Sequence, residues 1–341
     1  MNKKGMTLVE LLAVITVLAI ILIIAVPQIG NVIKSGRLNS FKDSALLIAK
    51  NAQREYMTQK TTNKDFDPNN MNCDNLANLS DDYGYCNVSF DSEGVATVTL
   101  AGTNSGKFND MKCVGTLEDI NCNIEQLDMV EVTFDLDGGT SPISSKKVLI
   151  GSNYGYLPTP TKEGYTFLGW NGKNLFNIDD FMDFYSPYQN TQPKKVEFEG
   201  EEVWKMYGHV NVDGRNLKYM EGKFKEKTSY TFSLDIYDVR LNNYYGIHIY
   251  VRYKNDSSSI ALPIHLTENE WHHVNFTSRV NDTIECIYVS YGTGDAYSYI
   301  KNFQIEEGTN ETAYEPYYIE SNTKVVQRQN HTLKAIWEPN S

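Results

Sequence analysis

Few residues in this sequence have the types and spacing that catalysis needs. His272 and His273 follow Glu270, and such a group could hold a metal ion or act as an acid–base pair. Adjacent side chains of a strand point to opposite faces, however, so these groups do not converge easily and fit a sandwich surface better. The sequence has no nucleophile elbow, P-loop, dinucleotide-binding fingerprint or zincin motif, and no convincing catalytic pair of carboxylates. We therefore expect a protein that is not an enzyme.

Aromatic side chains are a better indication of function. Tyrosine is unusually abundant, with 23 residues in the chain. Flat rings stack on the faces of sugars and lose little entropy when they bind. We therefore expect a surface glycan as a possible partner, and the candidate ligand-binding residues are Trp204, Tyr207, Tyr244 and Tyr245. The alternative for each ring is that it packs or decorates a β-sandwich.

Four of the five cysteines lie within one short region, and they are Cys73, Cys86, Cys113 and Cys122. Outside the cytoplasm such a group is expected to form two disulfides. Of the three possible pairings, we favour first with second and third with fourth, because short loops close most easily. A zinc site is the rival interpretation, but the region has no CxxC pair and no nearby histidine. Cys286, in a later strand, is expected to be a buried thiol outside these bridges.

The N-terminus carries the longest apolar run. Residues 11–26 are almost entirely apolar, and counted from Met6 the run has about the 20 residues that a bilayer requires. Lys3 and Lys4 precede it. The positive-inside rule keeps these lysines in the cytoplasm and sends the chain after Pro27 to the outer side.

A carboxylate stands at the start of this apolar run. Burying Glu10 would cost roughly 2.5–3.5 kcal/mol at the centre of a membrane and less near its edge, so a compensating partner is expected. An ordinary secretory signal has no such carboxylate, and it ends in a small-residue cleavage site that is missing after Val26. An ordinary signal peptide is therefore disfavoured.

The string Lys-Lys-Gly-Met-Thr-Leu-Val-Glu of residues 3–10, followed by an apolar helix, resembles the class III signal of prepilins. This resemblance implies that a prepilin peptidase cuts after Gly5 and that Met6 becomes an N-methylated N-terminus. It also implies that Glu10 pairs with such an amino group, often a neighbour's, during assembly. Phenylalanine is the commoner first residue, so Met6 departs from the pattern. The implied partners are the peptidase, the membrane and other pilins or pseudopilins.

A long helix and a small head are expected next. After a leader of residues 1–5, residues 6–60 should form the pilin helix, with its membrane part in residues 6–27. Apolar residues beyond the membrane part recur at three- and four-residue spacing, as in an amphipathic helix: Ile29, Ile33, Phe41, Ala45, Ile48, Ala49, Ala52 and Tyr56. Residues 61–128 should form the β head, with a hairpin that joins strands 86–90 and 95–100.

A second module follows the head. Residues 151–170 are punctuated by glycine, proline and aromatic residues and end in a Gly-Trp pair. This string resembles the internalin-type B-repeat, or Listeria–Bacteroides repeat, a small β-grasp-like surface module. That family closes soon afterwards with a Leu-x-Ala-x-Trp strand, which here occurs only at residues 333–337. We therefore expect a split repeat made of residues 129–170 plus 318–338.

The inserted segment, residues 171–317, is all-β by its pattern, and a jelly-roll sandwich fits it. Its end, residues 303–317, resembles the last strand of carbohydrate-binding-module-like jelly rolls. Some related jelly rolls hold a structural calcium, which Glu306 could help to bind, although a solvated carboxylate is the alternative. Otherwise no cofactor is expected. The expected strands lie at residues 230–236, 246–253, 270–276, 284–291 and 300–308.

The expected fold class is therefore multidomain α+β, with a long transmembrane or pilin helix, a disulfide-linked β head, a β-grasp-like repeat and an inserted jelly roll. The formal net charge of −12 argues against a nucleic-acid partner, because backbone phosphates repel an acidic surface.

The expected function is that of a minor type IV pilin or pseudopilin that displays a recognition module for adhesion or glycan binding. The alternative is an assembly pseudopilin of a DNA-uptake or secretion apparatus, with the C-terminal modules as spacer or docking surface. The precursor is expected in the bacterial cytoplasmic membrane. The assembled protein is then expected at the cell surface, with the C-terminal modules outside.

Overall fold

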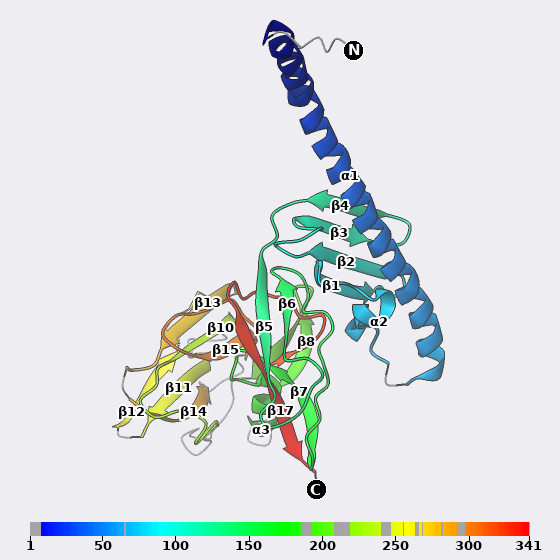
Figure 1. Ribbon diagram of the computed structural model, residues 1–341. Coiled ribbons are helices and arrows are strands. Elements are labelled where there is room, and N and C mark those ends of the chain that lie inside the picture. Colours follow the sequence, from blue (N-terminus) through cyan, green and yellow to red (C-terminus); the bar gives the residue numbers. More distant parts are fainter. Residues whose placement is uncertain are drawn as a thin grey trace, which may run out of the picture. The chain divides into compact units, whose positions relative to one another are not determined.

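The computed structural model describes residues 8–64, 66–185, 193–207, 219–239, 247–254, 256–262, 266–267, 269–280, 282–291 and 297–340. The chain divides into two compact units (Figure 1). Unit 1 contains Met1–Glu131, Lys146–Leu157 and Ser321–Val325, and unit 2 contains the rest of the chain. A long helix followed by several sheets confirms the multidomain α+β class. The domain boundaries inferred from the sequence remain a prediction.

Helix α1 spans Leu8–Thr62, so it ends two residues beyond the expected 60. Its last six predicted apolar positions, from Phe41 to Tyr56, are buried, whereas Ile29 and Ile33 are exposed together with the apolar run before them. The buried positions recur every three or four residues and therefore form one stripe, which packs on the head. The N-terminal half of α1 therefore has exposed apolar side chains, whereas its C-terminal half packs against the head.

The head is a four-stranded antiparallel sheet of order β1-β2-β3-β4, and α1 runs along it (Figure 1). The predicted hairpin is confirmed, with Phe90 opposite Ala96. Its turn is closed by the Asp91 carboxylate, which accepts the N–H groups of Glu93 and Val95 at 3.0 and 2.8 Å. Before the sheet come η1 (Pro68–Asn70) and α2 (Cys73–Ala77), and the strands are β1 (Tyr83–Phe90), β2 (Ala96–Gly102), β3 (Met111–Gly115) and β4 (Ile120–Ile124).

Two disulfides cross-link the head. Cys73 joins Cys86 across 13 residues, and Cys113 joins Cys122 across 9 residues. The second pair lies directly opposite on β3 and β4, with the Cα atoms 4.1 Å apart. Both disulfides have the pairing that we favour from the sequence because short loops close most easily. Cys286 is fully buried and lies outside both bridges.

A second sheet has the order β16-β7-β17-β5-β6. The C-terminal strand β17 pairs in parallel with β5 and antiparallel with β7, and Ala335 lies opposite Trp170. Trp170 is buried, and its indole N–H donates to the carbonyl of Pro158 at 2.8 Å. The closing strand therefore covers the Gly-Trp string although 160 residues separate them. The strands are β5 (Met129–Asp135), β6 (Ser145–Leu149), β7 (Tyr165–Asn171), β16 (Tyr318–Ile319) and β17 (His331–Pro339).

The segment between β7 and β16 is a β-sandwich. One sheet has the order β13-β10-β15-β9-β8 and the other the order β12-β11-β14. Both contribute to a single core, in which Phe232 and Ile305 of the first sheet pack with Val251 and Ile287 of the second. The elements are α3 (Ile178–Tyr185), β8 (Lys194–Phe198), β9 (Glu201–Tyr207), β10 (Tyr230–Val239), β11 (Ile247–Tyr253), β12 (Asp256–Leu262), β13 (Trp271–Thr277), β14 (Ile284–Tyr291) and β15 (Tyr297–Glu307).

Candidate functional site

The structure describes only some of the predicted functional residues. Gly5, Met6, Tyr244 and Tyr245 lie outside the described residues, and so does the side chain of Tyr207, although its backbone ends β9. Glu10 is exposed in the first turn of α1. The described ligand candidate is therefore Trp204.

Trp204 lines a cavity of about 320 Å³ in unit 2, which we call the aromatic pocket. Three tyrosines from the segment after the sandwich also line it, namely Tyr314, Tyr317 and Tyr318. Cavities of roughly 300–1,000 Å³ with aromatic walls and a few polar groups are typical of small-ligand sites. The aromatic pocket fits this description, and its rings come from chain segments more than 100 residues apart.

Strand register explains why Trp204 faces this cavity. Trp204 lies opposite Ile300 of β15 and opposite Lys195 of β8, so these three side chains share one face of the sheet. The hairpin between β8 and β9 turns at Glu199 and Gly200, which both have positive φ. The first turn of α3 brings Asp179 to the rim, and the side chain of Asn177 accepts the N–H of Asp179 at 3.2 Å.

Charged side chains surround the ring of Trp204. The ammonium of Lys195 lies 3.2 Å from Asp179, 3.6 Å from Glu202 and 5.5 Å from the centre of the Trp204 ring. Burial alone would lower the pKa of Lys195, but its hydrogen bonds and charge interactions with Asp179 and Glu202 outweigh burial and raise that pKa. Lys301 also lines the pocket, but its ammonium lies 4.4 Å from the centre of the Trp271 ring and forms an ion pair with Glu201. Lys195 is therefore the cation that lies between carboxylates beside Trp204.

The three tyrosines of the pocket keep their protons. Burial raises the pKa of each phenol, and negative charge adds to this effect, from Asp179 at Tyr314 and from Asp180 at Tyr317 and Tyr318. Protonated phenols can donate a hydrogen bond to a ligand hydroxyl while the ring face offers apolar contact.

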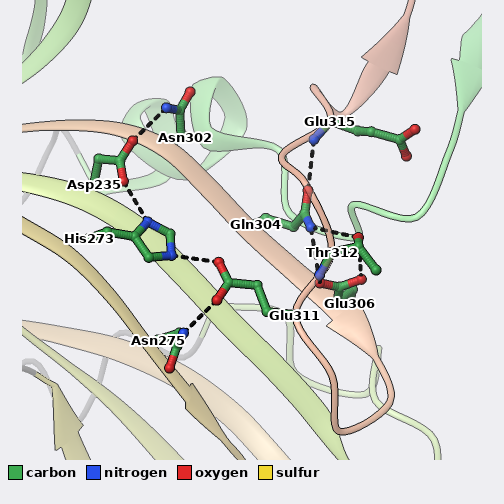
Figure 2. A network of polar contacts seen from close by, with 9 residues as sticks. All are labelled: Asp235, His273, Asn275, Asn302, Gln304, Glu306, Glu311, Thr312 and Glu315. Carbon is green, nitrogen blue, oxygen red and sulfur yellow. Dashed lines mark hydrogen bonds and ion pairs between the residues drawn. The ribbon is translucent and has the colours of Figure 1, made fainter. Parts of the chain in front are cut away.

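A buried polar network anchors the tyrosine segment (Figure 2). Glu306, which is 3% exposed, accepts the backbone N–H and the hydroxyl of Thr312 at 2.7 and 2.8 Å. Gln304 donates to Glu306 at 3.1 Å, and its amide oxygen accepts the backbone N–H of Glu315 at 2.8 Å. Tyr314 therefore lies between two fixed backbone positions. The described residues contain no group of three His, Cys, Asp or Glu side chains suited to a metal ion.

A second network holds the preceding loop on the outer face of the sheet. His273 lies opposite Asp235, with 2.6 Å between its Nδ1 atom and the carboxylate, and its Nε2 atom lies 2.5 Å from Glu311 (Figure 2). The hydrogen bond to Asp235 raises the pKa of His273, burial opposes the rise, and Glu311 adds to it. His272 contacts the carbonyl of Thr267 and lies 3.5 Å from Glu270, so the two histidines have separate partners.

Comparison with known families separates the chain into recognisable parts. Residues 1–26 match the family described as the prokaryotic N-terminal methylation motif. The N-terminus of the chain is thus similar to that of type IV pilins. Residues 131–192 match the Listeria-Bacteroides repeat domain. Among the described residues, one helix, Leu8–Thr62, is long and apolar enough to cross a membrane. The comparison with curated proteins gave no match.

Solved structures similar to this chain include carbohydrate-binding modules. A family 16 carbohydrate-binding module is 15% identical with a TM-score of 0.24, over 33% of this chain and 84% of that one. The CBM22-1 xylan-binding domain of Paenibacillus barcinonensis Xyn10C is 13% identical with a TM-score of 0.19, over 44% and 90%.

A third structure is larger than the matched region. It is the CBM22-1-GH10 part of a Clostridium thermocellum endo-1,4-beta-D-xylanase complexed with xylohexaose, 11% identical with a TM-score of 0.26. The match covers 44% of this chain but 29% of the xylanase chain. All three TM-scores are below 0.5, so the sandwich assignment rests on the two sheets and their shared core.

Trp204, which lines the pocket, is a ligand residue expected from the sequence, but the three tyrosines beside it are not. Tyr314 and Tyr317 were placed in the jelly-roll ending and Tyr318 in the second part of the split repeat. Three tyrosines within five residues, shortly after the last sandwich strand, are a signal that could have found them. Lys195 and Asp179 carried no signal, because only strand pairing and the start of α3 bring them to Trp204.

Proposed function

We propose that this pilin-like protein is a minor type IV pilin or pseudopilin that uses the aromatic pocket to recognise a surface glycan. The observation that carries this proposal is the grouping of Trp204 with Tyr314, Tyr317 and Tyr318 around a cavity of about 320 Å³. Aromatic faces supply apolar contact to sugar rings, and the protonated phenols supply hydrogen-bond donors. Binding would serve adhesion.

The N-terminal part supplies assembly and display. In this proposal prepilin peptidase removes residues 1–5, the N-terminal half of α1 lies in the membrane and later among other pilins, and Glu10 pairs with an N-terminal amine. The exposed apolar surface of α1 needs such surroundings, because a long apolar stripe is unstable in water. The modules after the membrane part then lie outside the cell.

The size of the C-terminal part favours a minor rather than a major subunit. Everything after Glu131 follows the strands of the head, and it makes up more than half of the chain. Repeating that bulk on every subunit of a tightly wound filament would crowd the surface. A sparse or terminal position in the filament avoids this crowding.

A glycan array probed with the full chain in non-ionic detergent tests the proposal. We expect saturable binding that Tyr314→Ala and Trp204→Leu each reduce at least tenfold, a loss of about 1.4 kcal/mol. The matched control is Trp271→Leu, which removes a half-buried tryptophan of the same sandwich outside the pocket and should leave binding unchanged. Near-UV circular dichroism verifies folding. If the folded chain binds no glycan, the C-terminal modules are better explained as a spacer or docking surface.

A further inference from the structure

The charges around the aromatic pocket indicate which sugars it can accept. Its lining contains three acidic residues, Asp179, Glu202 and Glu320, and two lysines, Lys195 and Lys301. The ammonium of Lys195 interacts with Asp179 and Glu202, whereas that of Lys301 lies over the Trp271 ring and pairs with Glu201, which does not line the pocket. An acidic sugar would therefore meet excess negative charge and would have to compete with carboxylates for Lys195.

The surroundings of Lys195 show that the pocket stabilises an ammonium group. Its ammonium lies between Asp179 and Glu202 and within 5.5 Å of the centre of the Trp204 ring. Carboxylates beside an aromatic face are the arrangement that proteins use to bind ammonium groups. Lys195 is 43% exposed at its side chain and has a flexible four-carbon stem, so it can turn towards solvent when another cation enters.

We propose that the aromatic pocket prefers a sugar that carries a protonated amine, such as a de-N-acetylated hexosamine, over neutral and acidic sugars. This inference rests on the proposed function and specifies its ligand class. The amine takes the position of the Lys195 ammonium between Asp179 and Glu202, and the sugar ring lies against the aromatic wall. Lys195 thus acts as an internal competitor of the ligand.

Isothermal titration calorimetry of the full chain in non-ionic detergent at pH 6 tests the inference. The probes are β-1,4-linked tetramers of glucosamine and of N-acetylglucosamine, and an α-1,4-linked tetramer of galacturonic acid. We expect the glucosamine tetramer to bind about tenfold more tightly than its acetylated form, and the galacturonic acid tetramer to bind most weakly. The preference should shrink when salt is raised, because the rim charges are exposed.

Three variants test how much the charged side chains contribute to glucosamine binding. Glu202→Gln and Asp179→Asn alter exposed side chains, and each should reduce the preference for glucosamine about threefold or more. Lys195→Met keeps the apolar stem but removes the competitor, so it should increase glucosamine affinity about threefold or more. Glu226→Gln removes an exposed carboxylate of the same unit outside the pocket and should change nothing.

The possible outcomes distinguish this inference from the proposed function. Tighter binding of the acetylated or galacturonic acid tetramer overturns the amine preference but leaves glycan recognition intact. Equal affinity for free lysine methyl ester and for the glucosamine tetramer would show that the sugar ring does not contribute to binding. A lysine side chain of a protein would then be the better occupant of the pocket. Weaker glucosamine binding by Lys195→Met also contradicts the inference. If neither the tetramers nor an array gives binding, the proposed function itself fails.

Discussion

Thr312 donates both its backbone N–H and its hydroxyl to the buried carboxylate of Glu306. A buried carboxylate is costly unless hydrogen bonds satisfy it, so this pair fixes the chain after β15 at one position. Gln304 repeats the arrangement at Glu315. Tyr314, between the two anchors, is therefore placed in the pocket by groups that do not line it.

Replacing Glu306 should destabilise unit 2. Glu306→Gln loses a charged acceptor of three hydrogen bonds and places an amide N–H₂ next to the N–H of Thr312, and we expect the free energy of unfolding to fall by about 2 kcal/mol. Urea denaturation followed by tryptophan fluorescence measures this change. Glu307→Gln is the matched control, since Glu307 is the next residue and is exposed. Equal effects of both variants would show that the Glu306 anchor does not contribute.

The contact of His273 with Asp235 and Glu311 should make stability depend on pH. The pKa of His273 is raised in the folded chain, so its contribution is fully present below the ordinary value of about 6.5. That contribution disappears as pH rises through the folded pKa. The difference in unfolding free energy between the native chain and His273→Gln should thus be larger at pH 5.5 than at pH 9. His331→Gln, at a partly buried histidine of unit 2 that contacts the carbonyl of Gln329, serves as the control. A difference that grows with pH would contradict the assignment.

Removing either disulfide should destabilise the head. The bridges close loops of 13 and 9 residues in sequence separation, for which chain entropy predicts a stabilisation of about 3 kcal/mol each. The double variants Cys73→Ser/Cys86→Ser and Cys113→Ser/Cys122→Ser should therefore each lower the denaturation midpoint under oxidising conditions. In a variant that lacks all four cysteines, a reductant should have no further effect on stability. A native chain whose stability does not change on reduction would show that the bridges do not form.

The C-terminal strand should control the environment of Trp170. Leu333 is fully buried on the core face of β17, so Leu333→Ala should cost about 2–4 kcal/mol through lost burial and a cavity. Lys334→Ala, the next residue, faces solvent and should change little. Because residues 331–341 include Trp337, their deletion is compared with Trp337→Phe, and it should shift tryptophan emission to longer wavelength as Trp170 becomes exposed. Unchanged emission after the deletion would mean that β17 does not cover Trp170.

Local patterns predicted much of the fold. The three- and four-residue spacing from Phe41 to Tyr56 predicted the buried stripe of α1, and alternation at Leu333 and Ala335 predicted the buried face of β17. Strands β10, β11, β13, β14 and β15 also lie within a few residues of their predicted positions. These patterns are visible because burial on one face of an element imposes a period on the sequence.

The candidate site was less predictable because it depends on long-range pairing. Asp235 meets His273 only through the register of β10 and β13, and Lys195 meets Trp204 only through the β8–β9 hairpin. Neither pair has a local periodic signal. Strands β8, β9 and β12 and helix α3 were likewise not predicted, and β9 carries Trp204 itself.

The paired ends of the sandwich have a mechanical consequence. The chain leaves the sheet β16-β7-β17-β5-β6 at Asn171 and returns to it at Tyr318, and these two residues lie opposite each other on β7 and β16. The side-chain amide of Asn171 also donates to the carbonyl of Tyr317 at 2.6 Å. A pulling force on the aromatic pocket is therefore divided between two neighbouring strands of one sheet. A module joined in tandem would place the same tension on a single connecting segment.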